Sequence, residues 1–200
     1  AAAGFSIIDF TNTSGVTTVG HGLSAAPECM WLKSYQDEVG TWSVYHKSLG
    51  NQYHLVMNTN AAKADVSNWG DTTPTASVFT VGAGGLFGDD NNNSPQIVYC
   101  WHGVDGFSKF GSYTGNGNAD GSYVYTGFRP ALVIIKRHNA AGDWYINDNT
   151  RSPFNEIAAE TLLVNNYLPE SSFGTNVDFV SNGFKARTTG AHRNANGGQY

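Results

Sequence analysis

The chain has 200 residues and a formal net charge of −5, with 13% aromatic residues, 14% charged residues and 24 glycines. The chain is acidic and lacks the cluster of Lys and Arg residues by which proteins bind nucleic acid. No apolar run approaches the roughly 20 residues that cross a bilayer. The length suits one large all-β domain or two domains of about 100 residues each.

Short runs rich in aromatic and β-branched residues alternate with segments rich in Gly, Asn, Asp and Ser, a pattern typical of strands joined by turns. In the first half, strands are predicted at 5–11, 16–19, 28–35, 41–46, 52–58, 77–81 and 96–101. The polar span 59–75 and the Gly-, Asn- and Asp-rich span 82–94 are predicted to be loops.

Two hairpins in the chain share one pattern, in which a Pro, an apolar run, a Lys, a polar turn and a Trp follow one another. The matching residues are Pro27 and Pro130, Lys33 and Lys136, and Trp42 and Trp144, at spacings of 103, 103 and 102. The spacing indicates an internal duplication. We therefore expect an all-β fold of two tandem, homologous β-sandwich-like repeats packed together, at 1–103 and 104–200, with little helix.

The second half is predicted to form strands at 123–126, 131–135, 162–165, 178–180 and 183–186, and a further strand that starts at Trp144. A Ser-Asn-Gly turn separates the last two strands, and Asn-Gly is a strong hairpin indicator. Only 153–161 has helical character, for two turns at most.

The last residues of the chain align with a strand of the first half. Gln199-Tyr200 matches Gln96-Ile97, so the closing strand of the second repeat is expected to be cut short. An unpaired neighbouring edge would be unfavourable. Two explanations of the shortened strand stay open. Either the native polypeptide continues past Tyr200, or another chain supplies the missing strand.

The two cysteines, Cys29 and Cys100, both lie in apolar runs predicted to be strands. Buried free thiols are common in such runs. The sequence leaves open whether the two form a disulfide, because it does not give the Cα separation that a disulfide requires.

Few residue patterns point to catalysis or metal binding. The chain has no Gly-x-Ser-x-Gly motif, and none of its six His residues forms an HxxxH or HExxH pair. His46 and His54 flank a turn and could share a metal or be a polar pair at the ends of two strands.

The segment 116–121 begins like a calcium loop, but Gly127 stands where that loop needs Glu. Asp89 and Asp90 could also chelate, although such runs are ordinary turn residues. We expect no cofactor, no metal and no enzymatic activity.

Aromatic residues offer the better binding candidates, because rings near loop ends can stack on sugars or form a protein contact. Trp42 and Trp144 recur in both hairpins and are interpreted as core residues. Trp69 and Tyr167 lie in long predicted loops and are expected at a surface. The full set of predicted binding residues is Trp69, Tyr167, Tyr45, Tyr145 and Asp148. No acidic residue stands out as a catalytic carboxylate of a glycosidase, and Asp148 is the least poor candidate among them.

Several phrases of the sequence resemble a known protein family. They are GFSIIDFTNT, GHGLSAAPECMWLK, WSVYHKSLGNQYHLVMNT, GFSKFGSYTGNGNADGSYVYTGFRPALVIIKR and VDFVSNGFKAR. The family comprises C-terminal repeat regions of large virion proteins, chiefly tail-fibre or tail-spike-like proteins of tailed phages, many of them marine. The resemblance covers nearly the whole chain. Its second repeat usually continues into a YIYxAFAE-like strand, of which Gln199-Tyr200 is the start.

The resemblance implies a non-catalytic module on the virion surface, without membrane insertion. The leading hypothesis is a tail-fibre or tail-spike adhesion domain that contacts a host glycan or an outer-membrane receptor. One alternative is an architectural protein of the capsid or tail that binds other virion proteins, and a third is a carbohydrate-active enzyme. A homo-oligomer is expected, since fibre modules are commonly trimers.

Overall fold

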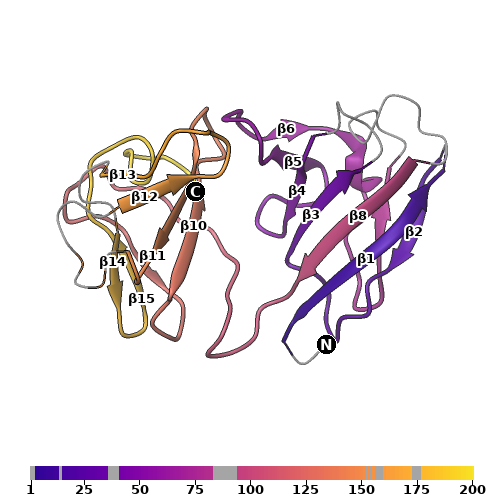
Figure 1. Ribbon diagram of the computed structural model, residues 1–200, viewed down its shortest axis with the longest axis horizontal. Coiled ribbons are helices and arrows are strands. Elements are labelled where there is room, and N and C mark those ends of the chain that lie inside the picture. The colour runs from indigo at the N-terminus through magenta and orange to yellow at the C-terminus, as the bar shows by residue number, and fades with distance from the viewer. Residues whose placement is uncertain are drawn as a thin grey trace. The chain divides into compact units, whose positions relative to one another are not determined.

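A computed structural model describes residues 3–13, 15–35, 41–82, 94–151, 153, 155, 160–172 and 177–200. The described residues form antiparallel β-sheets and one short 3-10 helix, and they contain no α-helix (Figure 1). The prediction that the chain is mainly β is therefore confirmed. No helix in the described ranges is long and apolar enough to span a membrane.

The chain divides into two compact units, each with its own sheets. Unit 1 comprises residues 1–57, 63–104 and 108–111, and unit 2 comprises residues 58–62, 105–107 and 112–200. The duplication that the hairpin spacing indicates stays a prediction.

Unit 1 contains a six-stranded sheet and a two-stranded sheet. The larger sheet has the order β1 (Phe5–Asn12), β8 (Ser94–Trp101), β3 (Cys29–Ser34), β4 (Ser43–His46), β5 (Tyr53–Val56) and β6 (Ala64–Asp65). The smaller sheet pairs β2 (Thr17–Gly20) with β7 (Val78–Val81), and the 3-10 helix η1 spans Ser67–Trp69. The β3–β4 hairpin lies within the predicted runs, whereas β8, which pairs with β1, begins at Ser94, before its predicted run 96–101 and at the end of the predicted loop 82–94.

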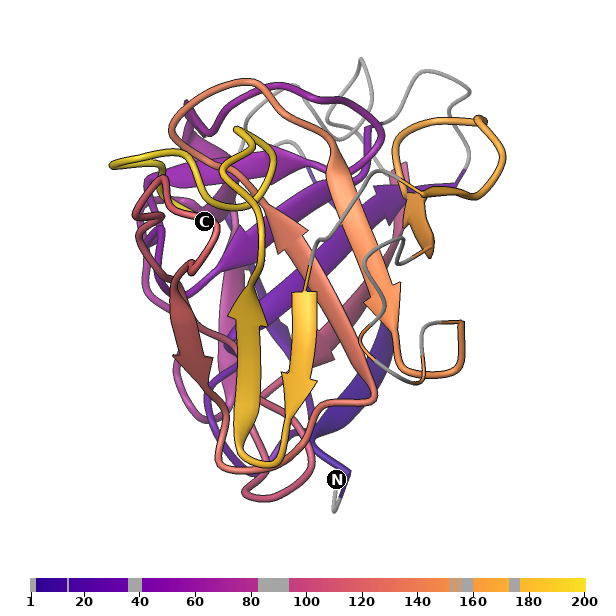
Figure 2. The same ribbon diagram turned by 90° about the vertical axis from the view of Figure 1, so that its left-hand side faces the viewer.

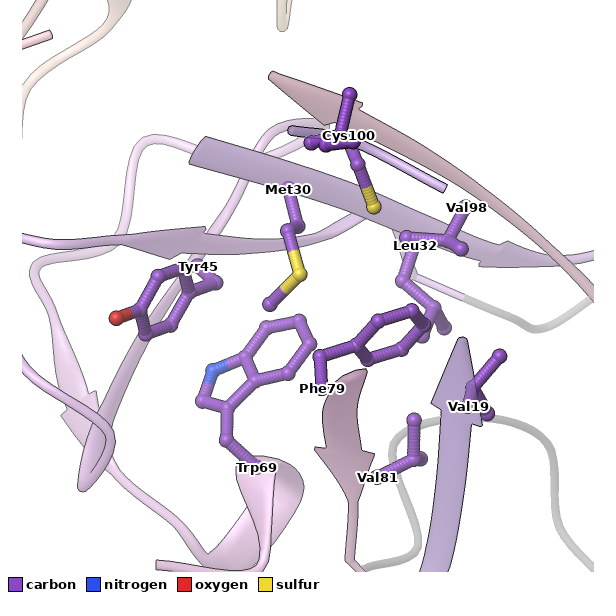
Figure 3. Packing of buried hydrophobic residues seen from close by; sticks show 10 residues of the cluster. Val19, Met30, Leu32, Tyr45, Trp69, Phe79, Val81, Val98 and Cys100 are labelled. Carbon is purple, nitrogen blue, oxygen red and sulfur yellow. The ribbon is translucent and has the colours of Figure 1, made fainter. Parts of the chain in front are cut away.

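One face of the six-stranded sheet of unit 1 forms the core of that unit (Figure 3). Met30 and Leu32 of β3 pack with Val98 of β8 against side chains of the smaller sheet and of η1. Alternate residues of a strand point to opposite faces, so the even-numbered residues of β1, β3 and β8 face this core. Burying such apolar area contributes about 25 cal/mol per Å² to stability.

Unit 2 contains a four-stranded sheet and a three-stranded sheet. The first has the order β10 (Leu132–Lys136), β11 (Trp144–Asp148), β12 (Glu160–Leu163) and β13 (Ser171–Ser172). The second has the order β14 (Val177–Val180), β15 (Gly183–Ala186) and β9 (Tyr123–Tyr125). The yellow strands β14 and β15 lie side by side in Figure 2, joined by the predicted turn.

The core of unit 2 lies between strands of its two sheets. Val133 and Ile135 of β10 cluster with Phe179, Phe184 and Tyr200. The ring of Tyr200 stacks on that of Tyr113 at 4.9 Å, and the backbones of the two residues exchange hydrogen bonds of 3.1 and 3.0 Å. Gln199-Tyr200 therefore pairs with the segment at Tyr113 through backbone hydrogen bonds.

Four predictions of local structure can be compared with the described residues. The predicted helix at 153–161 lies largely outside the described residues, and its last two residues begin β12. The predicted loop 59–75 contains β6 and η1. The hairpin turn between β14 and β15 is formed by Ser181 and Asn182, because Gly183 is already the first residue of β15. Most of the predicted loop at 82–94 lies outside the described residues.

Cys29 and Cys100 are buried free thiols on adjacent strands of unit 1. Cys29 lies opposite Trp101 and Cys100 lies opposite Met30, so the two side chains point to opposite faces of the sheet. A disulfide between them would require the β3–β8 register to change.

We expect neither thiol to react with a thiol reagent at pH 8 in the folded protein, because burial raises the pKa of Cys29 and of Cys100 to about 12. Both should react once the chain is unfolded in denaturant. Colorimetric thiol titration with and without denaturant measures this, and prompt labelling of either thiol in the folded protein would contradict it.

Candidate functional site

The six-stranded sheet of unit 1 has a second apolar face, on the side opposite to the core. Its odd-numbered positions carry large apolar side chains from three neighbouring strands. These residues are Phe5 and Ile7 of β1, Ile97, Tyr99 and Trp101 of β8, and Trp31 of β3. We call these six residues the aromatic face.

The strand register arranges the aromatic face in rows across the sheet. Phe5 lies opposite Trp101 in the first row. Tyr99 lies between Ile7 and Trp31 in the second row. Cross-strand neighbours on one face of an antiparallel sheet have Cβ atoms about 5 Å apart, so each row forms a continuous apolar strip.

The rings of the aromatic face support one another. The Phe5 ring stacks on the Trp101 ring with the centroids 5.1 Å apart, and the Tyr99 ring lies 19° from parallel to that of Trp101 at 6.2 Å. The Trp31 ring meets the Trp101 ring edge-on at 4.6 Å. Trp42, just before β4, adds a ring 6.1 Å from Tyr99. Such contacts stabilise aromatic pairs by about 0.5–1.5 kcal/mol each and hold the rings in place.

Solvent reaches the aromatic face. Ile7 is 56% exposed, and the five other residues are half-buried. A contiguous exposed apolar patch is uncommon on a protein surface and marks an interaction site more often than a scattered apolar residue does.

Polar groups border the aromatic face at one end. The next cross-strand row places Ile97 between Asp9 and Lys33. The Tyr35 hydroxyl donates to both carboxylate oxygens of Asp9, at 3.1 and 3.2 Å, and this hydrogen bond raises the pKa of Tyr35. The border therefore offers a carboxylate, an ammonium and a phenol next to the rings.

Two of the predicted binding residues lie in the core of unit 1. Trp69 has no exposed surface, and its ring meets that of Tyr45, itself 3% exposed, edge-on at 5.6 Å (Figure 3). The expectation that Trp69 lies at a surface is therefore wrong. The reason is that η1 turns its side chain beneath the sheet, where it joins the core cluster.

The other three predicted binding residues lie in unit 2 and are not brought together. Tyr145 is 4% exposed and packs under the buried Arg193 guanidinium, whose central carbon lies 4.2 Å from the ring centroid. Asp148 pairs with Arg151 at 3.0 Å and accepts backbone hydrogen bonds from the turn that follows β11. Tyr167 is 98% exposed, which agrees with the surface position expected for it.

The repeated tryptophans differ in burial. Trp144 is 5% exposed, as a core residue should be, whereas Trp42 is half-buried beside Tyr99 of the aromatic face. The interpretation of both as core residues therefore holds for Trp144 alone.

His46 and His54 do not face each other. Tyr45 points into the core of unit 1, so its neighbour His46 points to the other face of the sheet. Because Val44 lies opposite Leu55, the side chain of His54 is on the core side, where its Nδ1 lies 3.0 Å from the amide of Asn68. Burial lowers the pKa of His54. Within the described ranges no three His, Cys, Asp or Glu side chains gather as metal ligands, and Asp89 and Asp90 lie outside those ranges.

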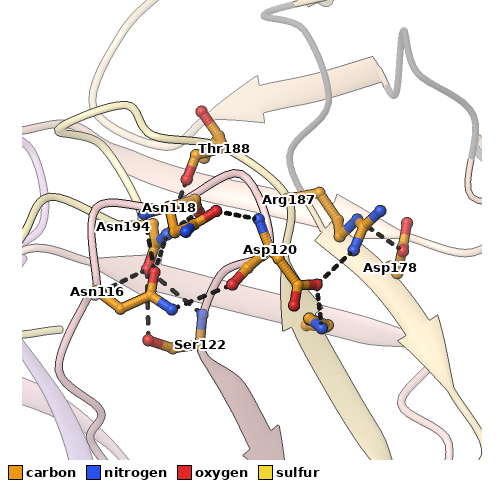
Figure 4. Close-up of polar contacts among 9 residues, drawn as sticks. Asn116, Asn118, Asp120, Ser122, Asp178, Arg187, Thr188 and Asn194 are labelled. Carbon is orange, nitrogen blue, oxygen red and sulfur yellow. Dashed lines mark hydrogen bonds and ion pairs between the residues drawn. The ribbon is translucent and has the colours of Figure 1, made fainter.

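The segment 116–121 in unit 2 uses its oxygen atoms as hydrogen-bond acceptors (Figure 4). The side-chain oxygen of Asn116 accepts from Asn118 N at 2.9 Å, and that of Asn118 accepts from Asp120 N at 2.9 Å. Asn116 also accepts from the buried Asn194 amide at 2.8 Å. These Asx turns engage the oxygens that a calcium loop would direct at a cation.

Asp120 is held by two cations of unit 2. Lys185 and Arg187 both donate to its Oδ1, the latter at 3.1 Å, and Arg187 also pairs with Asp178 at 3.2 Å (Figure 4). The hydrogen bond and charge of Lys185 lower the pKa of Asp120, and Arg187 adds to the effect.

Replacing Lys185 with Met should raise the pKa of Asp120 towards its ordinary 3.8, and Arg187→Met should raise it less. The depressed pKa also means that the ion pair stabilises the fold above pH 3.8 and that this contribution is lost as the pH falls through the folded-state value. Carboxyl NMR titration measures both variants. An unchanged Asp120 titration in Lys185→Met would contradict the assignment.

The sequence-based prediction missed the aromatic face. The aromatic face could have been predicted from the runs 5–8 and 97–101, because their odd-numbered residues are as apolar as their even-numbered ones. In an antiparallel sheet with a single buried face, the outward positions are normally polar.

Comparison with known proteins identifies the family of the chain but no individual protein that resembles it. No curated protein and no solved structure matches the chain. A family model described as a domain of unknown function (DUF7483) matches residues 1–200. The chain belongs to the DUF7483 family of domains of unknown function.

Proposed function

We propose that the protein is a non-catalytic binding module that holds a glycan against the aromatic face of unit 1. One observation carries the proposal: the six-stranded sheet fills the core with one face and still presents half-buried and exposed apolar side chains on the other. Ordinary sheet chemistry leaves that outer face polar.

A glycan is the partner that fits this surface best. A sugar ring has an apolar face of C–H groups, which packs on aromatic carbon, and hydroxyl groups at its rim, which need hydrogen-bond partners. The rings of Phe5, Tyr99 and Trp101 supply the first requirement. The second is met at the polar border by Asp9 and Tyr35.

The resemblance to phage tail-fibre and tail-spike repeats extends this proposal to a biological setting. The module would then lie on a virion surface, in an oligomer, and adhere to a glycan of the host cell. The architectural alternative rests on a different property of the same face, since Trp and Tyr are enriched in protein–protein interfaces as well. In that case the partner would be another virion protein.

The test is binding to an array of purified bacterial lipopolysaccharides and capsular polysaccharides. Ile7→Asn and Phe5→Ala alter the aromatic face at its exposed side and should weaken binding about tenfold or more, which corresponds to about 1.4 kcal/mol. Tyr167→Ala is the matched control, because it removes a fully exposed ring of unit 2.

The outcomes separate the hypotheses. Loss of binding in Tyr167→Ala, with Phe5→Ala unchanged, would move the site to the loop after β12 and contradict the proposal. Binding to no polysaccharide, together with capture of another virion protein that Phe5→Ala abolishes, would favour the architectural role.

A further inference from the structure

The cross-strand rows on the outer face of the six-stranded sheet continue along β8 beyond the rings. The first two rows belong to the aromatic face, and the third row, its polar border, holds Ile97 between Asp9 and Lys33. In the fourth row Thr11 lies opposite Pro95. Successive residues on one face of a strand are about 7 Å apart, so these rows cover about 20 Å along β8.

The chemistry of the rows changes along β8. Among the six residues of the aromatic face, only Tyr99 and the two tryptophans carry polar side-chain atoms. The third row adds a carboxylate and an ammonium. Tyr35, whose backbone N donates to Pro95 O at 3.4 Å, lies beside the fourth row and donates its hydroxyl to Asp9 at 3.1 and 3.2 Å. Hydroxyl groups of a ligand therefore find charged partners only from the third row onwards.

Burial decides in which direction this outer face is open. Val44 of β4 lies opposite Trp31 and is 2% exposed. Cys29 of β3 lies opposite Trp101 and is 6% exposed. Across the strands, the accessible surface of the first two rows therefore ends at β3. Along the strands it stays open, because Ile7 and the β1 side chains of the third and fourth rows are exposed.

We propose that the aromatic face binds a run of about three consecutive sugars of an extended glycan that lies along β8, with one sugar over each of the first three rows. A six-membered sugar ring is about as wide as the ring of Tyr99, so a single sugar covers one row. It cannot also reach the third row, about 14 Å from the first. The inference rests on the proposed function, and it narrows the ligand from any glycan to a chain of linked sugars.

Different interactions hold the two ends of the run. The sugars over the first two rows stack on the rings of Phe5, Tyr99 and Trp101 and bury apolar area there. The sugar over the third row exchanges hydrogen bonds with Asp9, and bonds to a charged group are stronger than neutral ones. Lengthening the chain therefore adds affinity until the third row is reached, and little afterwards.

Oligosaccharide length gives the first test. The polysaccharide that binds most tightly in the array is partly hydrolysed and separated into fractions of one to six sugars, and each fraction is titrated calorimetrically into the full chain. Kd should fall about tenfold or more between the monosaccharide and the trisaccharide or tetrasaccharide, and then level off. Equal Kd values for the monosaccharide and the hexasaccharide would overturn this inference and leave the proposed function standing. Binding of no polysaccharide would instead contradict the proposed function.

A pair of variants locates the two ends of the run. Phe5→Ala removes a ring of the first row and should weaken binding of every fraction. Asp9→Ala should weaken the trisaccharide about tenfold but leave the monosaccharide within about twofold, because only the longer ligand reaches this carboxylate. Asp65→Ala is the matched control, since Asp65 is an exposed aspartate of β6, at the far edge of the same sheet. Equal effects of Asp9→Ala on both ligands would overturn the inference.

NMR spectra of the saturated protein follow the same ligands residue by residue. The monosaccharide should shift ring signals of Tyr99 and Trp101 and leave those of Asp9 in place. The trisaccharide should also shift the methyl signals of Ile97 and the signals of Asp9, which belong to the third row. Identical sets of shifted signals for the two ligands would show that one sugar fills the site, and would overturn the inference.

Discussion

Replacing Asn194 with Ala is expected to lower the free energy of unfolding of unit 2 by about 3 kcal/mol, since it removes at least three hydrogen bonds that each contribute about 0.5–1.5 kcal/mol. Asn194 has no exposed surface. Its side-chain oxygen accepts from Asn116 N at 3.0 Å, and its amide donates to Asn118 O at 2.7 Å and to Thr188 O at 2.8 Å. Alanine would remove the hydrogen bonds to these three backbone groups.

The geometry around Asn194 also explains a glycine. A Cβ at Gly121 would lie 2.6 Å from the Asn194 amide nitrogen, so only glycine lets the 116–121 segment close on it. Asn194→Asp tests the amide separately, because it keeps the shape but turns a donor into a charged acceptor that faces carbonyl oxygens. Its effect should be at least as large as that of alanine.

Urea denaturation followed by the indole N–H NMR signal of Trp144 measures both variants, because Trp144 is buried in unit 2. Asn196→Ala is the matched control, since Asn196 is the same residue type two positions away and is exposed. It should change stability by less than about 0.5 kcal/mol. Equal effects at Asn194 and Asn196 would contradict the role of Asn194 as the centre of this network.

Trp69→Ala is expected to destabilise unit 1 by about 3–5 kcal/mol, the usual effect of removing a fully buried large aromatic side chain. Trp69 packs with Tyr45, Met30 and Phe79 in the core cluster, and alanine would leave a cavity there. Any loss of ligand binding in this variant would then reflect loss of the fold.

Tyr167→Ala is the control for that variant, because both aromatic residues lie in long stretches predicted to be loops. Tyr167 is 98% exposed, so its removal should leave the unfolding transition within about 0.5 kcal/mol of the parent. Chemical denaturation of the three proteins compares them directly. A stable Trp69→Ala protein would show that the core of unit 1 does not depend on this residue.

The strands of this protein are largely predictable from local sequence. Runs such as 28–35 and 183–186 are bounded by turn residues and rich in strand formers, so the local preferences and the sheets agree.

The positions of the aromatic residues relative to core and surface were not predictable in the same way. Trp69 sits in a polar stretch that reads as a loop, yet it is in the core, whereas Trp31 lies in an apolar strand and belongs to the aromatic face. Alternation along a strand separates two faces but does not say which face another sheet will cover.

The sequence by itself determined that the chain is mainly β, where most strands lie and that its thiols fall on strands. Only the tertiary structure decided that the odd-numbered side of β1, β8 and β3 stays partly open and that Asn194 is the centre of a buried network. These properties depend on contacts between residues distant in the chain, such as Asn194 with Asn116, and strand periodicity carries no information about them.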